Sequence, residues 1–166
     1  MGIAIDIVRT WRMPRVIMQL RLAGGVREDR ALVYLLLGCL LMFIAQFPRL
    51  WHDALVDPSL SFDMRVGGAL LGWIFLAPLG LYLFAALSHV FARIFGGQGS
   101  WYSARVALFW SLLAATPWWL LNGLTAGIVG SGALLSLTGG IALLVFVAVW
   151  VASIIEAEAG CHNQWT

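Results

Sequence analysis

The chain has 166 residues, of which 61% are hydrophobic and 11% are charged, with a mean hydropathy of +0.91 and a formal net charge of +2. Soluble domains carry about 25% charged residues, so this composition excludes an ordinary soluble globular protein. The small net charge gives no reason to expect a nucleic-acid partner.

Residues 1–30 are predicted to form a cytoplasmic, interfacial segment. Four apolar residues recur at i, i+3, i+4 and i+7, as on one face of an amphipathic helix: Ala4, Ile7, Val8 and Trp11. Asp6 and Thr10 lie off this stripe, and Pro14 ends or restarts the helix. The candidate residues for contact with the lipid interface are Arg9, Trp11, Arg12 and Arg15. The alternative is an ordinary topology signal that makes no specific lipid contact.

Four apolar stretches follow, at residues 31–47, 66–95, 104–129 and 132–157. A helix rises about 1.5 Å per residue, so about 20 residues cross the roughly 30 Å hydrocarbon core of a bilayer. We therefore predict an all-α membrane protein in which residues 31–157 form a bundle of four transmembrane helices. Residues 158–166 are predicted to form a polar C-terminal tail.

Prolines predict irregularities in three of these spans. Pro48 is expected to end the first helix. The second span is longer than the bilayer requires, and Pro78 with Gly80 predicts a kink in it. Around Pro117 the third span could be one kinked helix or two half-helices. We favour the kinked helix, because half-helices would leave backbone groups unpaired at membrane depth.

The arginines predict the orientation of the chain. All 10 basic residues are arginine, and most of them precede the first span or flank the connection between the second and third spans. The connection after the first span balances Arg49 and Arg65 with three aspartates. By the positive-inside rule the arginine-rich side is cytoplasmic, so we expect both termini in the cytoplasm.

Small and polar residues inside the spans are candidate contacts for helix packing or for a partner. Small residues four apart let two helix backbones approach closely, and amides in apolar surroundings hydrogen-bond to a neighbouring helix. The candidates are Gly68, Gly72, Gly123, Gly127, Ser136, Gly140, Gln46 and Asn122.

Residues that carry chemistry are scarce. His89 is the only histidine within a span, and we expect it to bond to a backbone carbonyl or water rather than to hold a metal or haem. Apart from Glu156 in the last turn of the fourth span, the spans contain no Asp, Glu or Lys, which argues against ion-coupled transport. Residues 96–100 resemble a phosphate loop only in their glycines, so we expect a tight turn. We expect no catalytic residue, no cofactor and no metal.

The residues around this turn resemble a known family. Residues 85–95 read Ala-Ala-Leu-Ser-His-Val-Phe-Ala-Arg-Ile-Phe, residues 96–101 read Gly-Gly-Gln-Gly-Ser-Trp, and a span with Ala-Ala-Thr-Pro at 114–117 follows. This pattern resembles the bacterial branch of the Yip1-domain family, whose second and third spans are joined by a Gly-Gly-x-Gly-Ser turn. Residues 9–15 and 27–32 are similar to the shorter proteobacterial members. The resemblance implies a multi-pass protein of the bacterial inner membrane, although typical members have five spans.

Taken together, the sequence favours a non-catalytic membrane protein that acts through helix packing. Its expected partners are membrane lipids and other membrane proteins, in a homo- or hetero-oligomer or as an accessory subunit of a respiratory or photosynthetic complex. The alternative is a small oligomeric transporter or channel subunit, in which Thr116 and Asn122 line a polar path between the kinked spans.

Overall fold

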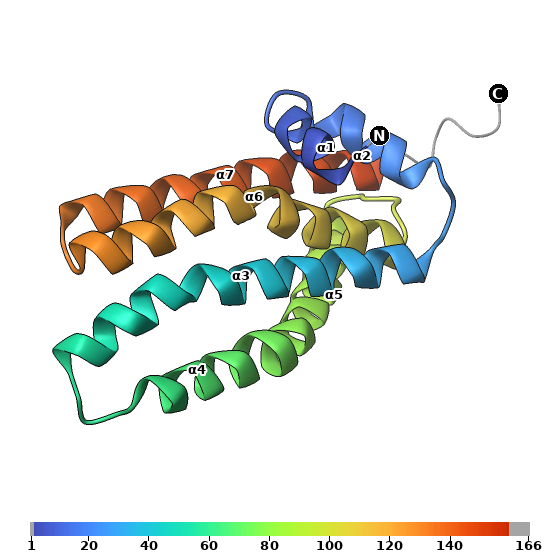
Figure 1. Cartoon of the computed structure of the whole chain (residues 1–166). Helices are drawn as coiled ribbons and strands as arrows, with labels where there is room; N and C mark the ends of the chain where they lie inside the picture. Colours follow the sequence, from blue (N-terminus) through green and yellow to red (C-terminus); the bar gives the residue numbers. More distant parts are fainter. Residues whose placement is uncertain (1, 160–166) are drawn as a thin grey trace.

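The computed structural model describes residues 2–159, in which all regular structure is helical (Figure 1). The elements are α1 (Ile3–Thr10), α2 (Pro14–Leu22), α3 (Glu28–Val56), α4 (Phe62–Leu70), the π-helical turn η1 (Leu71–Leu76), α5 (Ala77–Ile94), α6 (Trp101–Val129) and α7 (Ala133–Ala159). Four helical stretches are long and apolar enough to cross a membrane: Glu28–Val56, Phe62–Ile94, Trp101–Val129 and Ala133–Ala159. The predicted all-α membrane protein with four spans is confirmed.

The helix α6 lies at the centre of the bundle, between α3 and α7. Its side chains Leu108, Phe109, Trp110 and Leu113 are among the largest that are fully buried. In the most apolar window of each span, 44% of α3 and 39% of α6 are buried inside the chain. The corresponding shares are 6% for the second span and 11% for α7, so these two helices form the periphery.

Two glycines allow α6 to lie directly against α3. A Cβ atom on Gly127 would lie 2.5 Å from the Cβ of Pro48, and one on Gly123 would overlap the carbonyl oxygen of Ala45. The expectation that Pro48 ends the first helix is wrong, because α3 continues to Val56. A membrane helix tolerates an internal proline where a neighbouring helix supports it, and here Pro48 packs on the glycine face of α6.

The other two prolines lie within helical spans. In the second span, η1 ends at Leu76, two residues before Pro78, and the ribbon bends between α4 and α5 (Figure 1). The third span is a single helix that contains Pro117. Proline has no N–H, so the carbonyl of Leu113 lacks its helical donor. The hydroxyl of Thr116 donates to this carbonyl at 2.7 Å and supplies the missing hydrogen bond.

The helices α1 and α2 form an N-terminal hairpin that packs against α6 and α7 (Figure 1). Arg21 pairs with Asp6 at 2.5 Å, donates to the hydroxyl of Tyr34 at 2.7 Å and stacks 4.1 Å from the ring centre of Trp110. The indole of Trp110 donates to the hydroxyl of Thr10 at 3.1 Å. Asp6 and Thr10 of α1 therefore face the bundle, together with the apolar Ile17 and Met18 of α2.

Substituting Gly127 with alanine should weaken the bundle, because the added Cβ overlaps Pro48. We expect Gly127→Ala to lower the free energy of unfolding by about 1–3 kcal/mol, the usual range for overpacking. The measurement is a titration of the full chain from mild detergent into SDS, followed by circular dichroism. Gly68→Ala is the matched control, since no atom lies within 4 Å of its Cβ position. Equal stability of the two variants would show that α3 and α6 do not touch at Gly127.

Candidate functional site: a buried histidine–glutamate pair

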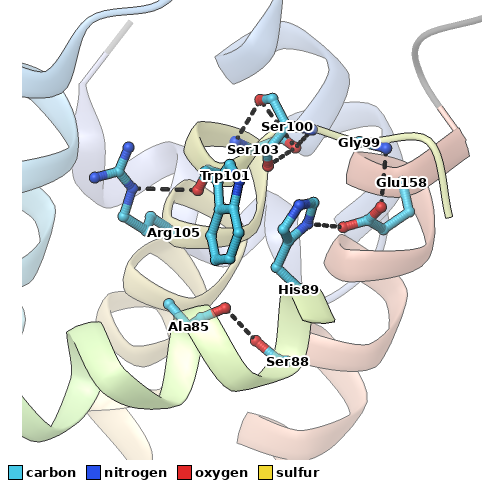
Figure 2. A network of polar contacts seen from close by, with 9 residues as sticks. All are labelled: Ala85, Ser88, His89, Gly99, Ser100, Trp101, Ser103, Arg105 and Glu158. Carbon is cyan, nitrogen blue, oxygen red and sulfur yellow. Dashed lines mark hydrogen bonds and ion pairs between the residues drawn. The ribbon is translucent and has the colours of Figure 1, made fainter. Parts of the chain in front are cut away.

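A polar cluster lies at the end of the bundle where α5, α6 and α7 meet (Figure 2). The Nδ1 atom of His89 on α5 lies 2.9 Å from Oε1 of Glu158 on α7, and the two side chains are 1% and 9% exposed. The other carboxylate oxygen accepts the backbone N–H of Gly99 at 2.8 Å. The backbone carbonyl of Glu158 accepts the N–H of Gln98 at 3.2 Å. One residue of α7 thus holds both α5 and the α5–α6 loop.

The glycines of this loop have two different roles. Gly96 has a φ of 89°, which favours glycine, as expected for a tight turn. At Gly97 a Cβ would lie 2.5 Å from Oε2 of Glu158. At Gly99 it would lie 2.7 Å from the carbonyl oxygen of Ala157. These two glycines are required because the loop backbone lies directly on the end of α7.

The start of α6 completes the cluster (Figure 2). The Ser100 hydroxyl accepts the N–H of Ser103, and the Ser103 hydroxyl accepts the N–H of Ser100, so a capping box begins the helix. This cap fixes Trp101, whose ring lies 4.5 Å from the His89 ring. The histidine is therefore enclosed by an indole on one side and by a carboxylate on the other.

This geometry fastens α5 and the α5–α6 loop to the end of α7. The His89 ring is almost fully enclosed. Within residues 2–159, no group of three His, Cys, Asp or Glu side chains could hold a metal ion. An apolar groove of about 660 Å³ runs between α5 and α7, with Phe91 and Ile154 in its walls and Glu158 at its polar end.

The pairing of His89 with Glu158 differs from the sequence-based expectation. His89 was expected to bond to a carbonyl or water, and Glu158 was assigned to the polar tail at 158–166. In the structure α7 continues to Ala159, which brings Glu158 onto the same helical face as Trp150 and Ile154. The spacing of four residues between Trp150, Ile154 and Glu158 was the feature of the sequence that could have predicted this continuation of the helix. Residues 160–166 of the predicted tail lie outside the described residues.

The structure places the predicted small residues in two different settings. Gly123 and Gly127 face α3 at close range. Around Gly68, Gly72 and Gly140, by contrast, no atom lies within 4 Å of the Cβ position. The exposed Ser136 of α7 donates at 3.4 Å to the carbonyl of Gly132, which lies just before the helix.

The two predicted amides also differ. Asn122 donates to the carbonyl of Leu135 at 3.1 Å and to the hydroxyl of Thr138 at 3.0 Å, which joins α6 to α7. Gln46 lines an apolar cavity of about 450 Å³ between α3, η1, α5, α6 and α7, together with Trp73 and Trp119.

The predicted lipid-interface residues lie at the connection between α1 and α2. Trp11 reaches inward, and its indole donates to the carbonyl of Ala114 at 2.9 Å. Arg9, Arg12 and Arg15 surround it with exposed side chains.

The four spans and their packing define the class: a multi-pass helical membrane protein. No protein-family model matches the chain, and no curated protein or solved structure shows significant similarity to it. The resemblance to the Yip1-domain family stays a prediction.

Removing the Glu158 carboxylate should release the α5–α6 loop. We expect Glu158→Ala to increase hydrogen exchange at the Gly99 amide tenfold or more, because a hydrogen bond to a charged group contributes about 1.5–3 kcal/mol. Glu158→Gln keeps an acceptor for this amide and should give a smaller increase. The control is Glu156→Ala, which removes only an exposed contact with Gln19. Unchanged exchange in Glu158→Ala would contradict the fastening role.

Proposed function

We propose that this chain is a non-catalytic, Yip1-type protein of the bacterial inner membrane. It acts by packing its second span against a helix of another membrane protein or of a second copy, as an accessory subunit would. The observation that carries this proposal is the unoccupied glycine pair Gly68 and Gly72 on the peripheral second span.

A second glycine pair with the same spacing packs against a neighbouring helix within the chain. Gly123 and Gly127 on α6 are also four residues apart, and there the backbone of α3 fills the space beside them. Glycine costs about 0.5–1 kcal/mol relative to alanine inside a helix. A glycine pair that faces only lipid tails has no contact that offsets this cost. A partner helix offsets it, because small residues let the two backbones pack closely. The open pair therefore supports an intermolecular contact.

The position of η1 supports the same span as the interacting surface. Gly72 belongs to this π-helical turn, and π turns inside α-helices occur frequently at functional sites. Only 6% of the most apolar window of the span is buried inside the chain, so most of its surface is available.

The proposed orientation places both termini in the cytoplasm. It is supported by the arginines of the N-terminal hairpin and of the α5–α6 loop region, which belong to the same end of the bundle (Figure 1). At the opposite end, Arg49 lies 3.7 Å from Asp53 and Arg65 lies 3.0 Å from Asp57. These pairs reduce the positive charge of the side that we assign to the periplasm.

The transporter alternative stays a prediction without a structural observation in its favour. It required Thr116 and Asn122 to line a polar path. Both side chains are instead used within the chain, by the carbonyl of Leu113 and by the α6–α7 contact respectively.

Filling the open glycine pair should abolish the assembly. We expect Gly68→Leu/Gly72→Leu to run as a single chain in native electrophoresis after extraction in mild detergent, whereas the natural chain runs as a larger species. The chain itself should stay folded, because both added side chains enter open space. Mass spectrometry of the larger species identifies the partner.

The control is Leu79→Phe, a bulky change at an exposed position of α5 in the same span, which should leave the larger species intact. The proposal is overturned if the natural chain is a single chain in native membranes, or if the double variant still forms the larger species.

A further inference from the structure

The N-terminal hairpin exposes large apolar side chains, while its first helix buries polar ones. Asp6 and Thr10 are buried, although polar residues of surface helices normally face solvent. Five large apolar residues point away from the bundle, Ile5, Val8, Met13, Val16 and Leu20, with exposed fractions from 49% to 61%. Arg9, Arg12, Arg15 and Gln19 are exposed beside them. An outward apolar face is favourable when its surroundings are lipid rather than water.

The buried polar groups of the hairpin have partners inside the bundle. Asp6, Arg21 and Thr10 are satisfied through the contacts with one another, Tyr34 and Trp110 described above. Buried charges that are paired and hydrogen-bonded avoid most of the cost of leaving water. The hairpin can therefore contact acyl chains through its exposed apolar side chains, while its exposed arginines extend toward the interface.

The contact of Trp11 with Ala114 sets the depth of the hairpin. Ala114 lies 13 residues beyond Trp101, the first residue of α6, which corresponds to about 20 Å along the helix. From Ala114 to the end of α6 at Val129 is about 22 Å, whereas a hydrocarbon core is about 30 Å thick. With Val129 placed at the far edge of the hydrocarbon core, the tip of the hairpin reaches about 8 Å into the apolar layer, within the roughly 5–10 Å typical of interfacial helices.

Two arginines at this tip have no anionic partner in the chain. Arg12 and Arg15 are exposed, and within residues 2–159 neither guanidinium makes an ion pair or a hydrogen bond. Arg49 and Arg65, at the other end of the bundle, each have an aspartate. Guanidinium groups at the edge of a hydrocarbon layer extend toward the interface and require a counterion there. The phosphate of a lipid headgroup matches the planar fork of arginine, which binds phosphate through two parallel hydrogen bonds.

We propose that the N-terminal hairpin is embedded in the leaflet at its end of the bundle and binds the headgroup phosphate of anionic phospholipids through Arg12 and Arg15. The apolar side chains of the hairpin contact the acyl chains of the same lipids. This site is separate from the glycine pair on the second span, so it does not depend on the proposed partner helix.

Lipid binding is tested on the full chain in detergent by native mass spectrometry with phosphatidylglycerol, with phosphatidylcholine and with inorganic phosphate. We expect phosphatidylglycerol to bind more tightly than phosphatidylcholine and to be lost in Arg12→Gln/Arg15→Gln. The expected loss is about thirtyfold, since each arginine near an anionic surface contributes roughly fivefold. Arg49→Gln, a single change at the other end, should bind as the natural chain does. Equal binding by the double variant, or displacement of the lipid by millimolar inorganic phosphate, overturns the proposal.

The depth of the hairpin in the membrane is tested in a chain that keeps Arg12 and Arg15. Misfolding of the arginine variant therefore cannot affect this test. A fluorescent probe is attached to Leu20→Cys in a Cys161→Ser background, in nanodiscs that contain phosphatidylglycerol; Cys39 is buried. We expect quenching by lipids that carry a spin label on the acyl chain, and little quenching by iodide. A probe at Val26→Cys, in the exposed loop after the hairpin, should show the opposite pattern. Iodide quenching at Leu20 equal to that at Val26 places the hairpin in water and overturns the proposal.

Discussion

The direct contact of α6 with α3 is the constraint on which the rest of the structure depends. It requires Gly123 and Gly127, because any side chain there would occupy the space of Ala45 and Pro48. In lipid there is no hydrophobic force between helices, so packing at short range must hold the pair together. Once α6 is fixed, its turn at Gly130 leads to α7, and its buried face supplies Trp110, against which the N-terminal hairpin closes.

The peripheral helix α7 shows how a poorly buried span is held in place. Only 11% of its most apolar window is buried, and polar contacts near its two ends add to its packing against α6 and α2. At one end Asn122 bonds to Leu135 and Thr138. At the other end Glu158 bonds to His89 and to the loop at Gly99. Hydrogen bonds between membrane helices contribute modestly, at about 0.6–2 kcal/mol each, but their directions specify the register of the two helices.

Features that depend on local sequence were predictable, and features that depend on long-range register were not. The four spans follow from runs of apolar residues, and the break before α2 follows from Pro14. His89 and Glu158 lie 69 residues apart, and nothing local indicates that their helices end at the same height. The continuation of α3 through Pro48 depends likewise on a glycine of another helix. In the N-terminal segment, the burial of Asp6 depends on Arg21, which lies on the next helix and pairs with it.

The turn η1 has a consequence for how the second span can diverge between related chains. A π-helical turn holds about one residue more than an α-helical turn, and each residue of an α-helix advances about 100° around the axis. The N-terminal half of the span, with Gly68, is therefore rotated about the helix axis relative to the C-terminal half, which carries His89. Gain or loss of one residue within Leu71–Leu76 would turn the N-terminal half to a new direction while the C-terminal half stayed fastened to α7. The η1 turn thus allows the direction of the exposed glycine face to change without a change in the internal packing of the bundle.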